Sequence, residues 1–224
     1  MILGIETATS VCSVGLVRDG GLLVETSEDA GRRHSIVLVD MIEHVLKEVG
    51  ASKREFTGVA VSAGPGSFTG LRIGMALAKG ICLAAEIPLL VVSTLEALAL
   101  QSGSTTSMVC ACLDARHDEL YSGVYMGNGI SREAVHLDAS RSVDDLAGLL
   151  EAGAVVAGFG ISDYAEALER RGHSVLPDIC PSGGAVASLG ERQLKAGVLT
   201  PLDLAEPNYC KKSQPERLQA EKRQ

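Results

Sequence analysis

A glycine-rich segment is the part of this 224-residue sequence best suited to bind an anion. The run Gly64-Pro-Gly-Ser-Phe-Thr-Gly70 lies between a short apolar stretch and a long helical one. The backbone N–H groups of such a loop, and the positive end of the helix that follows, suit phosphate. The spacing is neither GxGxxG nor a Walker A box, and no Lys-Ser or Lys-Thr pair follows. We therefore interpret Gly64, Gly66 and Gly70 as a structural loop with Ser67 or Thr69 capping the helix, and keep phosphate binding as the alternative.

Two acidic residues end apolar strands in the two halves of the sequence, where each could hold a divalent cation. Glu6 closes the first expected strand, and Asp114 closes the strand that opens the second half. Neither acid has a second carboxylate nearby in the sequence to complete a cation site. We therefore expect neither acid to bind a metal.

Histidine and serine give no pattern that indicates catalysis. His34 and His44 lie ten residues apart on one expected helix, which places them on faces about 80° apart and argues against a shared metal. Ser67 and Ser93 have no neighbouring His–acid pair in a known nucleophile spacing. We therefore expect no catalytic residue and no cofactor.

The six cysteines are spread along the chain without a CxxC pair. Cys110 and Cys112 alternate along an expected strand, and we take their side chains to point to opposite faces, so that they cannot share one metal. We interpret the cysteines as small buried residues of a protein in a reducing compartment.

The composition favours a cytoplasmic α/β protein over a nucleic-acid-binding or membrane protein. Hydrophobic residues make up 46% of the chain and aromatic residues only 3%, so the core must consist mainly of small aliphatic side chains. The net charge of −8 argues against holding RNA through the chain's own phosphate contacts, and the one basic stretch runs from Lys211 to Arg223. The most apolar segment, Met75 to Leu100, is broken by charged residues and Pro88, so we expect no membrane span.

The two halves of the sequence follow one plan. Residues 108–133 align with the N-terminus without a gap at an offset of 108, which places Asp114 on Glu6 and Gly123 on Gly15. In both halves an apolar strand ends in an acid and a hairpin follows. Two α/β units result, at 1–101 and 108–210, with a polar linker between them and a basic tail at 211–224. This pattern predicts a duplicated architecture of the actin, Hsp70 and sugar-kinase type.

Hydrophobic periodicity and turn residues locate the individual elements. We expect strands at 2–7, 11–18, 21–26, 59–63, 89–93, 154–159 and 174–176, in addition to the strand and hairpin of the repeat that begins at 108. Helices are expected at 35–49, 71–86, 95–101, 143–151, 162–171 and 184–195.

The helix expected at 71–86 has more apolar surface than one core contact requires. Its polar residues Arg72, Lys79 and Glu86 recur every seven positions in one narrow line, and the other positions are apolar or glycine. The preceding helix adds two apolar residues and two acids outside its own core stripe. We predict that these helices form a docking face for another protein chain, made of Ile36, Val39, Asp40, Glu43, Arg72, Ala76, Lys79 and Leu83. The alternative is a helix sandwiched inside the domain.

Several motifs resemble those of the bacterial TsaB (YeaZ) family. They are the glycine motif Gly64–Gly74, the opening Ile2–Thr7, the segments Val92–Leu95 and Asp114–Tyr121, and Pro207-Asn-Tyr209. The resemblance covers residues 1–210 and implies a duplicated ASKHA (actin/Hsp70-like, ribonuclease H-like) fold with two subdomains. It also implies a role in making threonylcarbamoyladenosine on tRNA, beside the anticodon, as the partner of the catalytic paralogue TsaD and the ATPase TsaE.

Two departures from TsaD-like sequences favour a non-catalytic chain. TsaD-like proteins carry a His-Met-Glu-Gly-His run whose two histidines bind a metal, and the same place here reads Thr94-Leu-Glu-Ala-Leu98. The TsaD opening continues with Cys-Asp-Glu, where Thr9-Ser-Val11 stands here. The resemblance therefore implies an interaction subunit that dimerises with TsaD, meets tRNA only through the complex and forms a homodimer when alone. The alternative is an ATP-dependent transferase or a metallopeptidase of the same superfamily.

Overall fold

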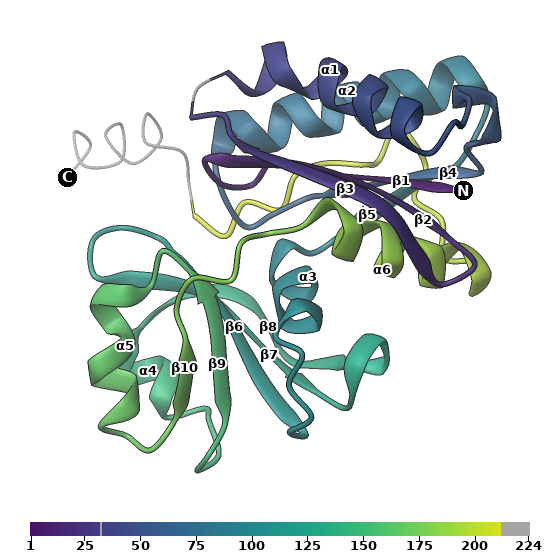
Figure 1. Cartoon of the computed structure of the whole chain (residues 1–224). Coiled ribbons are helices and arrows are strands. Elements are labelled where there is room, and N and C mark those ends of the chain that lie inside the picture. The colour runs from purple at the N-terminus through teal and green to yellow at the C-terminus, as the bar shows by residue number, and fades with distance from the viewer. Residues whose placement is uncertain (32, 212–224) are drawn as a thin grey trace.

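Two five-stranded sheets with equivalent strand orders form the framework of the molecule (Figure 1). The computed structural model describes residues 1–31 and 33–211. The first sheet has the order β3-β2-β1-β4-β5, with β1 Ile2–Glu6, β2 Val11–Arg18, β3 Gly21–Asp29, β4 Gly58–Ser62 and β5 Leu89–Val92. The second has the order β10-β9-β6-β7-β8, with β6 Met108–Asp114, β7 Glu119–Met126, β8 Glu133–Ser142, β9 Val155–Phe159 and β10 Ser174–Leu176.

The pairing pattern within the two sheets confirms the predicted duplication. In each sheet the first three strands pair antiparallel, and the last two run parallel to the opening strand of that unit. Glu6 ends β1 and Asp114 ends β6, so the two acids occupy equivalent positions, as the sequence repeat predicts. The fold is the duplicated α/β architecture of the actin and Hsp70 class.

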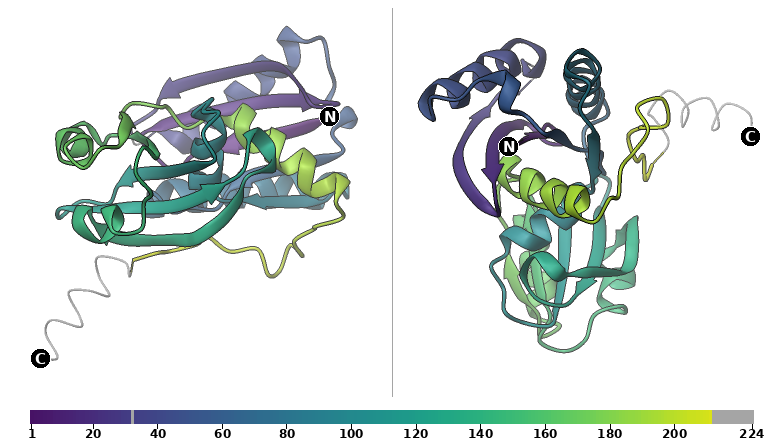
Figure 2. Two further views of the ribbon diagram at one scale, coloured as in Figure 1. Left: turned by 90° about the horizontal axis from the view of Figure 1, so that it is seen from below. Right: turned by 90° about the vertical axis from the view of Figure 1, so that its right-hand side faces the viewer.

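Helices and sheets alternate in layers through the molecule (Figures 1 and 2). α1 (His34–Glu48) and α2 (Phe68–Ala85) cover the outer face of the first sheet, and α6 (Gly183–Lys195) covers its inner face. α3 (Thr94–Gln101) packs on the inner face of the second sheet. α4 (Val143–Ala147) and α5 (Ser162–Glu169) cover the outer face of that sheet. The core is therefore divided into apolar layers on the faces of the two sheets.

Differences from the predicted elements lie mainly at their ends. α2 begins at Phe68, three residues before the predicted start, because the Ser67 hydroxyl caps it by accepting the Gly70 N–H at 3.2 Å. β3 runs to Asp29 because β2 pairs with it over its whole length. The helix expected at 143–151 already ends at Ala147. A short 3₁₀ turn, η2 (Gly129–Ser131), lies in the connection between β7 and β8.

Two helices pack on the sheet that is formed by the other half of the chain. α6 follows β10 in the chain but lies on β1, β2 and β4, where Ala185, Val186 and Leu189 share a core with Ile2 and Leu90. α3 precedes the linker but packs on β6 and β7. The linker predicted at 102–107 therefore lies between the strands of the first sheet and those of the second. The helices α3 and α6 each cross over to pack on the sheet formed by the other half of the chain.

Glycines allow α6 to approach the first sheet closely. A Cβ atom on Gly4 would lie closer than 3.0 Å to the Gly183 carbonyl oxygen, and one on Gly15 would lie as close to the Gly184 nitrogen. Real Cβ atoms do not make such contacts, so the helix and the strands can meet only because these positions lack side chains. The Gly183 N–H also donates to the Ser13 hydroxyl at 2.9 Å, which fixes the start of the helix over β2.

Cys110 and Cys112 share one face of β6, so the expectation that they point to opposite faces is wrong. Side chains alternate along a strand, and residues two apart therefore lie on the same side. Both are buried in the core between the second sheet and its outer helices, with their sulfur atoms 3.5 Å apart. Cys12 and Cys82 are buried as well, and burial raises the pKa of the Cys12 thiol to about 12. Cys180, in contrast, is exposed.

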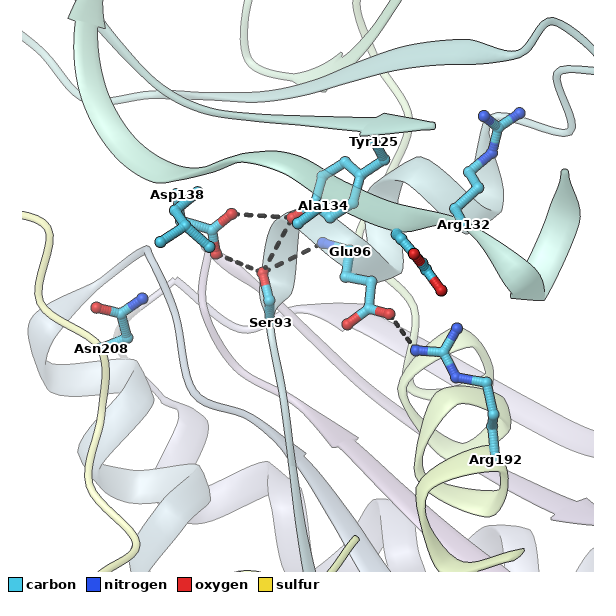
Figure 3. Close-up of a pocket in the computed structure, with 10 residues that line it drawn as sticks. Ser93, Glu96, Tyr125, Arg132, Ala134, Asp138, Arg192 and Asn208 are labelled. Carbon is cyan, nitrogen blue, oxygen red and sulfur yellow. Dashed lines mark hydrogen bonds and ion pairs between the residues drawn. The ribbon is translucent and has the colours of Figure 1, made fainter. Parts of the chain in front are cut away.

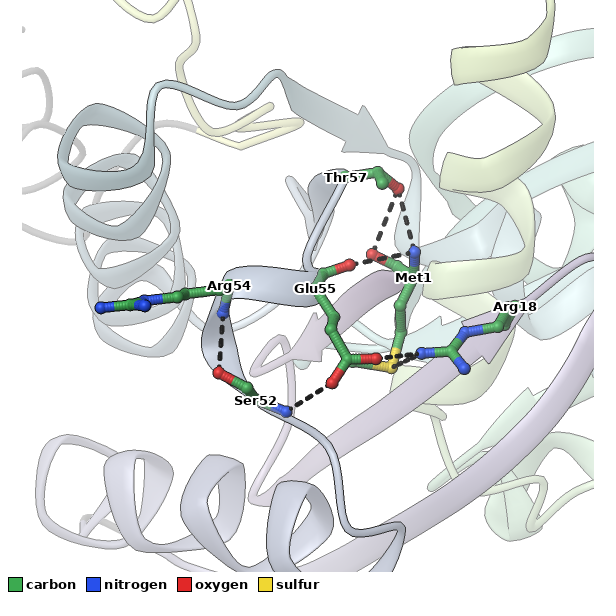
Figure 4. A network of polar contacts seen from close by, with 6 residues as sticks. All are labelled: Met1, Arg18, Ser52, Arg54, Glu55 and Thr57. Atoms are coloured by element: carbon green, nitrogen blue, oxygen red, sulfur yellow. Dashed lines mark hydrogen bonds and ion pairs between the residues drawn. The ribbon is translucent and has the colours of Figure 1, made fainter.

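The N-terminus is fixed by a network of polar contacts with the segment before β4 (Figure 4). The terminal amine donates to the Thr57 hydroxyl at 3.1 Å, and Arg18 pairs with Glu55 at 2.8 Å. Glu55 lies in the 3₁₀ turn η1 (Lys53–Glu55) and also accepts the Ser52 N–H at 2.8 Å. These contacts align the start of β1 with β4, and β1 carries Glu6 and Thr7 to the glycine loop.

Candidate functional site

The glycine loop packs tightly against the turn that follows β1. A Cβ atom on Gly70 would lie closer than 3.0 Å to the Thr7 carbonyl oxygen, although Gly70 itself has helical backbone geometry. Gly64 has a φ of +110°, and a Cβ atom there would lie closer than 3.0 Å to the Asn208 carbonyl oxygen. Position 70 therefore requires glycine because a side chain has no space there. Position 64 requires glycine for the same reason and also because of its backbone conformation.

Backbone donors of this loop are partly used within the chain. The Ser67 N–H donates to the Ala8 carbonyl oxygen at 2.6 Å, and the Gly70 N–H donates to the Ser67 side chain. These donors would otherwise be the ones directed at an anion. The loop thus holds β1, α2 and the C-terminal segment together.

The two equivalent acids lie in different surroundings. Glu6 is fully buried and accepts the Ala8 N–H at 2.6 Å, while its other carboxylate oxygen has no hydrogen-bond partner among the described residues. Burial raises the pKa of Glu6 to about 7. Asp114 is exposed and accepts the Arg116 N–H at 2.8 Å. Across residues 1–31 and 33–211, no three His, Cys, Asp or Glu side chains are grouped so that they could hold a metal ion.

A pocket of about 540 Å³ lies between β8, the crossing helices and the C-terminal segment (Figure 3). The Ser93 hydroxyl donates to Asp138 at 2.6 Å, and the Tyr125 hydroxyl donates to the same carboxylate at 2.9 Å. Burial raises the pKa of Asp138 despite these donors. On another wall Arg192 of α6 forms an ion pair with Glu96 of α3. The polar groups thus pair with one another and connect the two halves of the molecule.

Ser93 shows why sequence reasoning overlooked this network. In the sequence, Ser93 has no neighbouring His–acid pair. In the structure the acid Asp138 lies beside it, although the two residues are 45 positions apart in the chain. The Ser93 oxygen also accepts the N–H groups of Leu95 and Glu96 and so caps α3. We interpret Ser93 as a structural residue because its hydroxyl is used in these bonds.

All eight residues predicted for the docking face lie at the surface of α1 or α2. Ile36 is 67% exposed, Val39 45% and Leu83 73%, which are high values for large apolar side chains. Asp40, Glu43, Arg72 and Ala76 are exposed, and Lys79 is half-buried. The opposite side of α2 packs on the sheet through Leu71, Met75, Ala78 and Cys82. The structure thus places these residues on one outer layer, and their role in docking stays a prediction.

α2 is also apolar enough to resemble a membrane span. Among the described residues it is the one helix that meets the requirements of length and composition, and a third of it is buried within the chain. Such evidence is weak for a single helix, and here one side of it forms part of the core of the first sheet. The apolar side chains of α2 are therefore divided between a side that contacts the core and a side that is exposed.

Sequence comparisons identify the relatives of the chain. The family described as TsaD, tRNA N6-adenosine threonylcarbamoyltransferase, matches residues 24–219. The tRNA threonylcarbamoyladenosine biosynthesis protein TsaB of Escherichia coli K12 is 40% identical over 135 residues, which make up 58% of this chain and 57% of that protein. TsaB of Buchnera aphidicola subsp. Baizongia pistaciae is 30% identical over 163 residues, 69% of this chain and 73% of that protein. The match thus spans little more than half of the E. coli relative.

A solved structure extends the likeness to nearly the whole chain. YeaZ from Pseudomonas aeruginosa superposes with a TM-score of 0.83 at 28% sequence identity, over 93% of this chain and 98% of that one. The likeness in fold therefore covers both units of the chain. The chain belongs to the TsaD family of proteins, and its relatives within that family are TsaB (YeaZ) proteins.

Proposed function

We propose that this chain is a non-catalytic subunit that binds a TsaD-type enzyme and supports formation of threonylcarbamoyladenosine beside the anticodon of tRNA. A TsaE-type ATPase would join the same complex in the cytoplasm. The observation that carries the proposal is that large apolar side chains are exposed on both outer helices of the first sheet, Ile36 and Val39 on α1 and Leu83 on α2. Large exposed apolar side chains gathered with charged neighbours are typical of protein interfaces.

The surroundings of α3 support a role without metal chemistry. Thr94 and Leu98 stand where TsaD-like sequences have their two metal-binding histidines. Both are fully buried in the protein, and Leu98 belongs to the apolar layer between α3 and the second sheet. A leucine side chain has no atom that can ligate a metal, so the pair offers no site of the TsaD kind.

The same face suits a homodimer when the partner is absent. An isologous contact through α1 and α2 would cover the exposed apolar side chains of both copies. Homodimer and heterodimer would then compete for one surface, and one chain could not form both. The net charge of −8 favours tRNA contact through the complex rather than through this chain alone.

We expect Ala76→Glu to abolish docking while the fold is retained. Ala76 is exposed on α2, so the fold tolerates the change. A partner seated there would have to bury a charged carboxylate that also competes for Arg72, one turn away on the same helix face, at a cost of about 3 kcal/mol or more. Sedimentation should show a monomer with unchanged circular dichroism, and tRNA modification in the reconstituted system should fall. Ala152→Glu adds the same charge at an exposed turn of the second unit and serves as the control. An Ala76→Glu chain that stays dimeric and fully active would exclude this helix face as the interface.

Calorimetry distinguishes the subunit from the alternative, an ATP-dependent transferase or metallopeptidase. The isolated chain titrated with ATP and Mg²⁺ is expected to show no turnover, because the glycine loop uses its Ser67 and Gly70 donors internally. Micromolar binding together with hydrolysis would instead establish an enzyme. The loop is the feature that motivates this test, because a glycine-rich loop between a strand and a helix N-terminus is a place where other proteins hold phosphate.

A further inference from the structure

One exposed guanidinium group on the docking face is held in a fixed orientation by residues far away in the sequence. Arg72 lies on the first turns of α2, and its guanidinium carbon is 3.9 Å from the centre of the Phe68 ring. Its Nε–H donates to the Tyr209 hydroxyl at 3.0 Å. The Phe68 and Tyr209 rings are themselves in contact, with their centres 4.3 Å apart. The cation is therefore stacked on one ring and hydrogen-bonded to the other.

Tyr209 is in turn fixed by the segment 207–211, which we call the C-terminal strap. The Asn208 N–H donates to the Ala63 carbonyl oxygen at 2.6 Å, next to the glycine loop. Lys211 at the other end forms an ion pair with Glu119 at 2.5 Å and donates to the Ala115 carbonyl oxygen at 2.9 Å. The strap thus runs from the first unit to the second, as the yellow trace in Figure 1 shows. Tyr209 lies between two fixed ends of this segment.

Arg72 has no acidic partner within residues 1–31 and 33–211. Its one hydrogen bond there uses Nε, and both terminal nitrogen atoms remain available. An exposed arginine normally loses considerable side-chain freedom when it binds, and here that freedom is already lost before any partner arrives. A planar guanidinium with two free, parallel donors matches a carboxylate, which accepts both at once.

We propose that Arg72 receives an aspartate or glutamate carboxylate of the partner subunit, and that Tyr209 is the positioning residue that orients it. The inference rests on the proposed docking of a partner at this face. The charge of the chain favours a carboxylate from a protein over a phosphate from tRNA. The docking face also carries the acids Asp40 and Glu43, and the whole chain has a net charge of −8, which repels a polyanion but tolerates one carboxylate seated on one arginine.

The test measures affinity between the purified full chain and its TsaD-type partner, without tRNA. Arg72→Met should raise the dissociation constant by about 30-fold or more, because the partner's carboxylate loses its counter-ion. Arg72→Lys keeps the charge but not the planar fork, and should raise it by about 10-fold. Tyr209→Phe keeps the ring and loses the hydroxyl, with an expected increase of about 5-fold. Arg170→Met removes the same charge at the residue that caps the end of α5 (Ser162–Glu169) in the second unit, and is the control.

A double variant separates positioning from a general structural effect. If Tyr209 acts through Arg72, then Tyr209→Phe should have no further effect in the Arg72→Met chain. Additive effects of the two changes would overturn the positioning role. The chemistry of the partner group is tested with Arg72→Lys and a carbodiimide, at protein concentrations that saturate binding. The introduced amine should become linked through an amide bond to an aspartate or glutamate peptide of the partner, and an absence of that link would count against a carboxylate.

Three other results would overturn the inference, each in a distinguishable way. If Ala76→Glu abolishes binding but Arg72→Met binds within about twofold of the original chain, the docking face stands and the role of Arg72 fails. If both variants bind normally, the proposed face itself is wrong. If Arg72→Met binds the partner normally but the complex loses affinity for tRNA, the guanidinium contacts a phosphate instead.

Discussion

Gly70→Val is expected to lower the free energy of unfolding by about 3 kcal/mol or more. The new Cβ atom would lie closer than 3.0 Å to the Thr7 carbonyl oxygen, and the atom it meets belongs to the backbone at the end of β1. Neither side can move easily, because Thr7 follows a strand paired on both sides and Gly70 lies in the first turn of α2. Urea unfolding followed by circular dichroism measures the loss.

Gly80→Ala is the matched control on the same helix. A Cβ atom at Gly80 meets nothing within 4 Å, so the substitution should stabilise the chain by up to about 1 kcal/mol through reduced backbone entropy of the unfolded state. Opposite effects of the two substitutions would show that contact with Thr7, and not helix propensity, requires glycine at Gly70. A Gly70→Val chain that unfolds at the same urea concentration as the original would refute the packing described for the loop.

Glu6→Gln is expected to stabilise the chain at alkaline pH and to have little effect at acidic pH. The folded-state pKa of Glu6 is raised from 4.5 to about 7, chiefly by burial, so the folded state holds its proton more tightly than the unfolded state. Stability from this group is fully present below pH 4.5 and is lost as the pH rises through 7. The loss amounts to about 3 kcal/mol when each pKa unit is converted at 1.36 kcal/mol. A glutamine carries no charge and can still accept the Ala8 N–H.

The difference in unfolding free energy between Glu6→Gln and the original chain, measured from pH 4.5 to 8.5, isolates this group from other carboxylates. Asp114→Asn is the control, because Asp114 is the equivalent residue of the second unit and is exposed. Its difference curve should remain flat. If the Glu6→Gln curve is flat as well, then burial of the Glu6 charge does not lower the free energy of unfolding.

The sequence was sufficient to predict the fold because the relevant signals are local or periodic. The placement of Glu6 and Asp114 at equivalent strand ends followed from an ungapped repeat, and the paired sheets bear it out. The separation of α2 into a core side and an outer side followed from helical periodicity, and Met75 is indeed buried whereas Ala76 is exposed. Strand alternation, properly applied, would also have placed Cys110 and Cys112 together.

Contacts between distant segments were beyond the reach of the sequence. Periodicity shows that α6 has an apolar side but does not say which of the two sheets receives it. Gly183 and Gly184 indicate that another part of the backbone approaches the helix closely. Only the structure shows that this part is β1 at Gly4 and β2 at Gly15. The hydrogen bond from Arg72 to the Tyr209 hydroxyl joins positions 137 residues apart, and no local pattern predicts such a pair. The network of Ser93, Tyr125 and Asp138 was missed for the same reason.

The crossing of α6 has a consequence for how the chain folds as the ribosome makes it. Most N-terminal domains fold as they emerge, before the rest of the protein exists. Here the first sheet cannot be completed in that way, because the inner-face residues Ile2, Ala60 and Leu90 are covered by a helix that begins only at Gly183. The nascent sheet therefore keeps an apolar face open while the whole second unit is synthesised. The two halves arose from one repeated plan, yet each newly made molecule must fold them together.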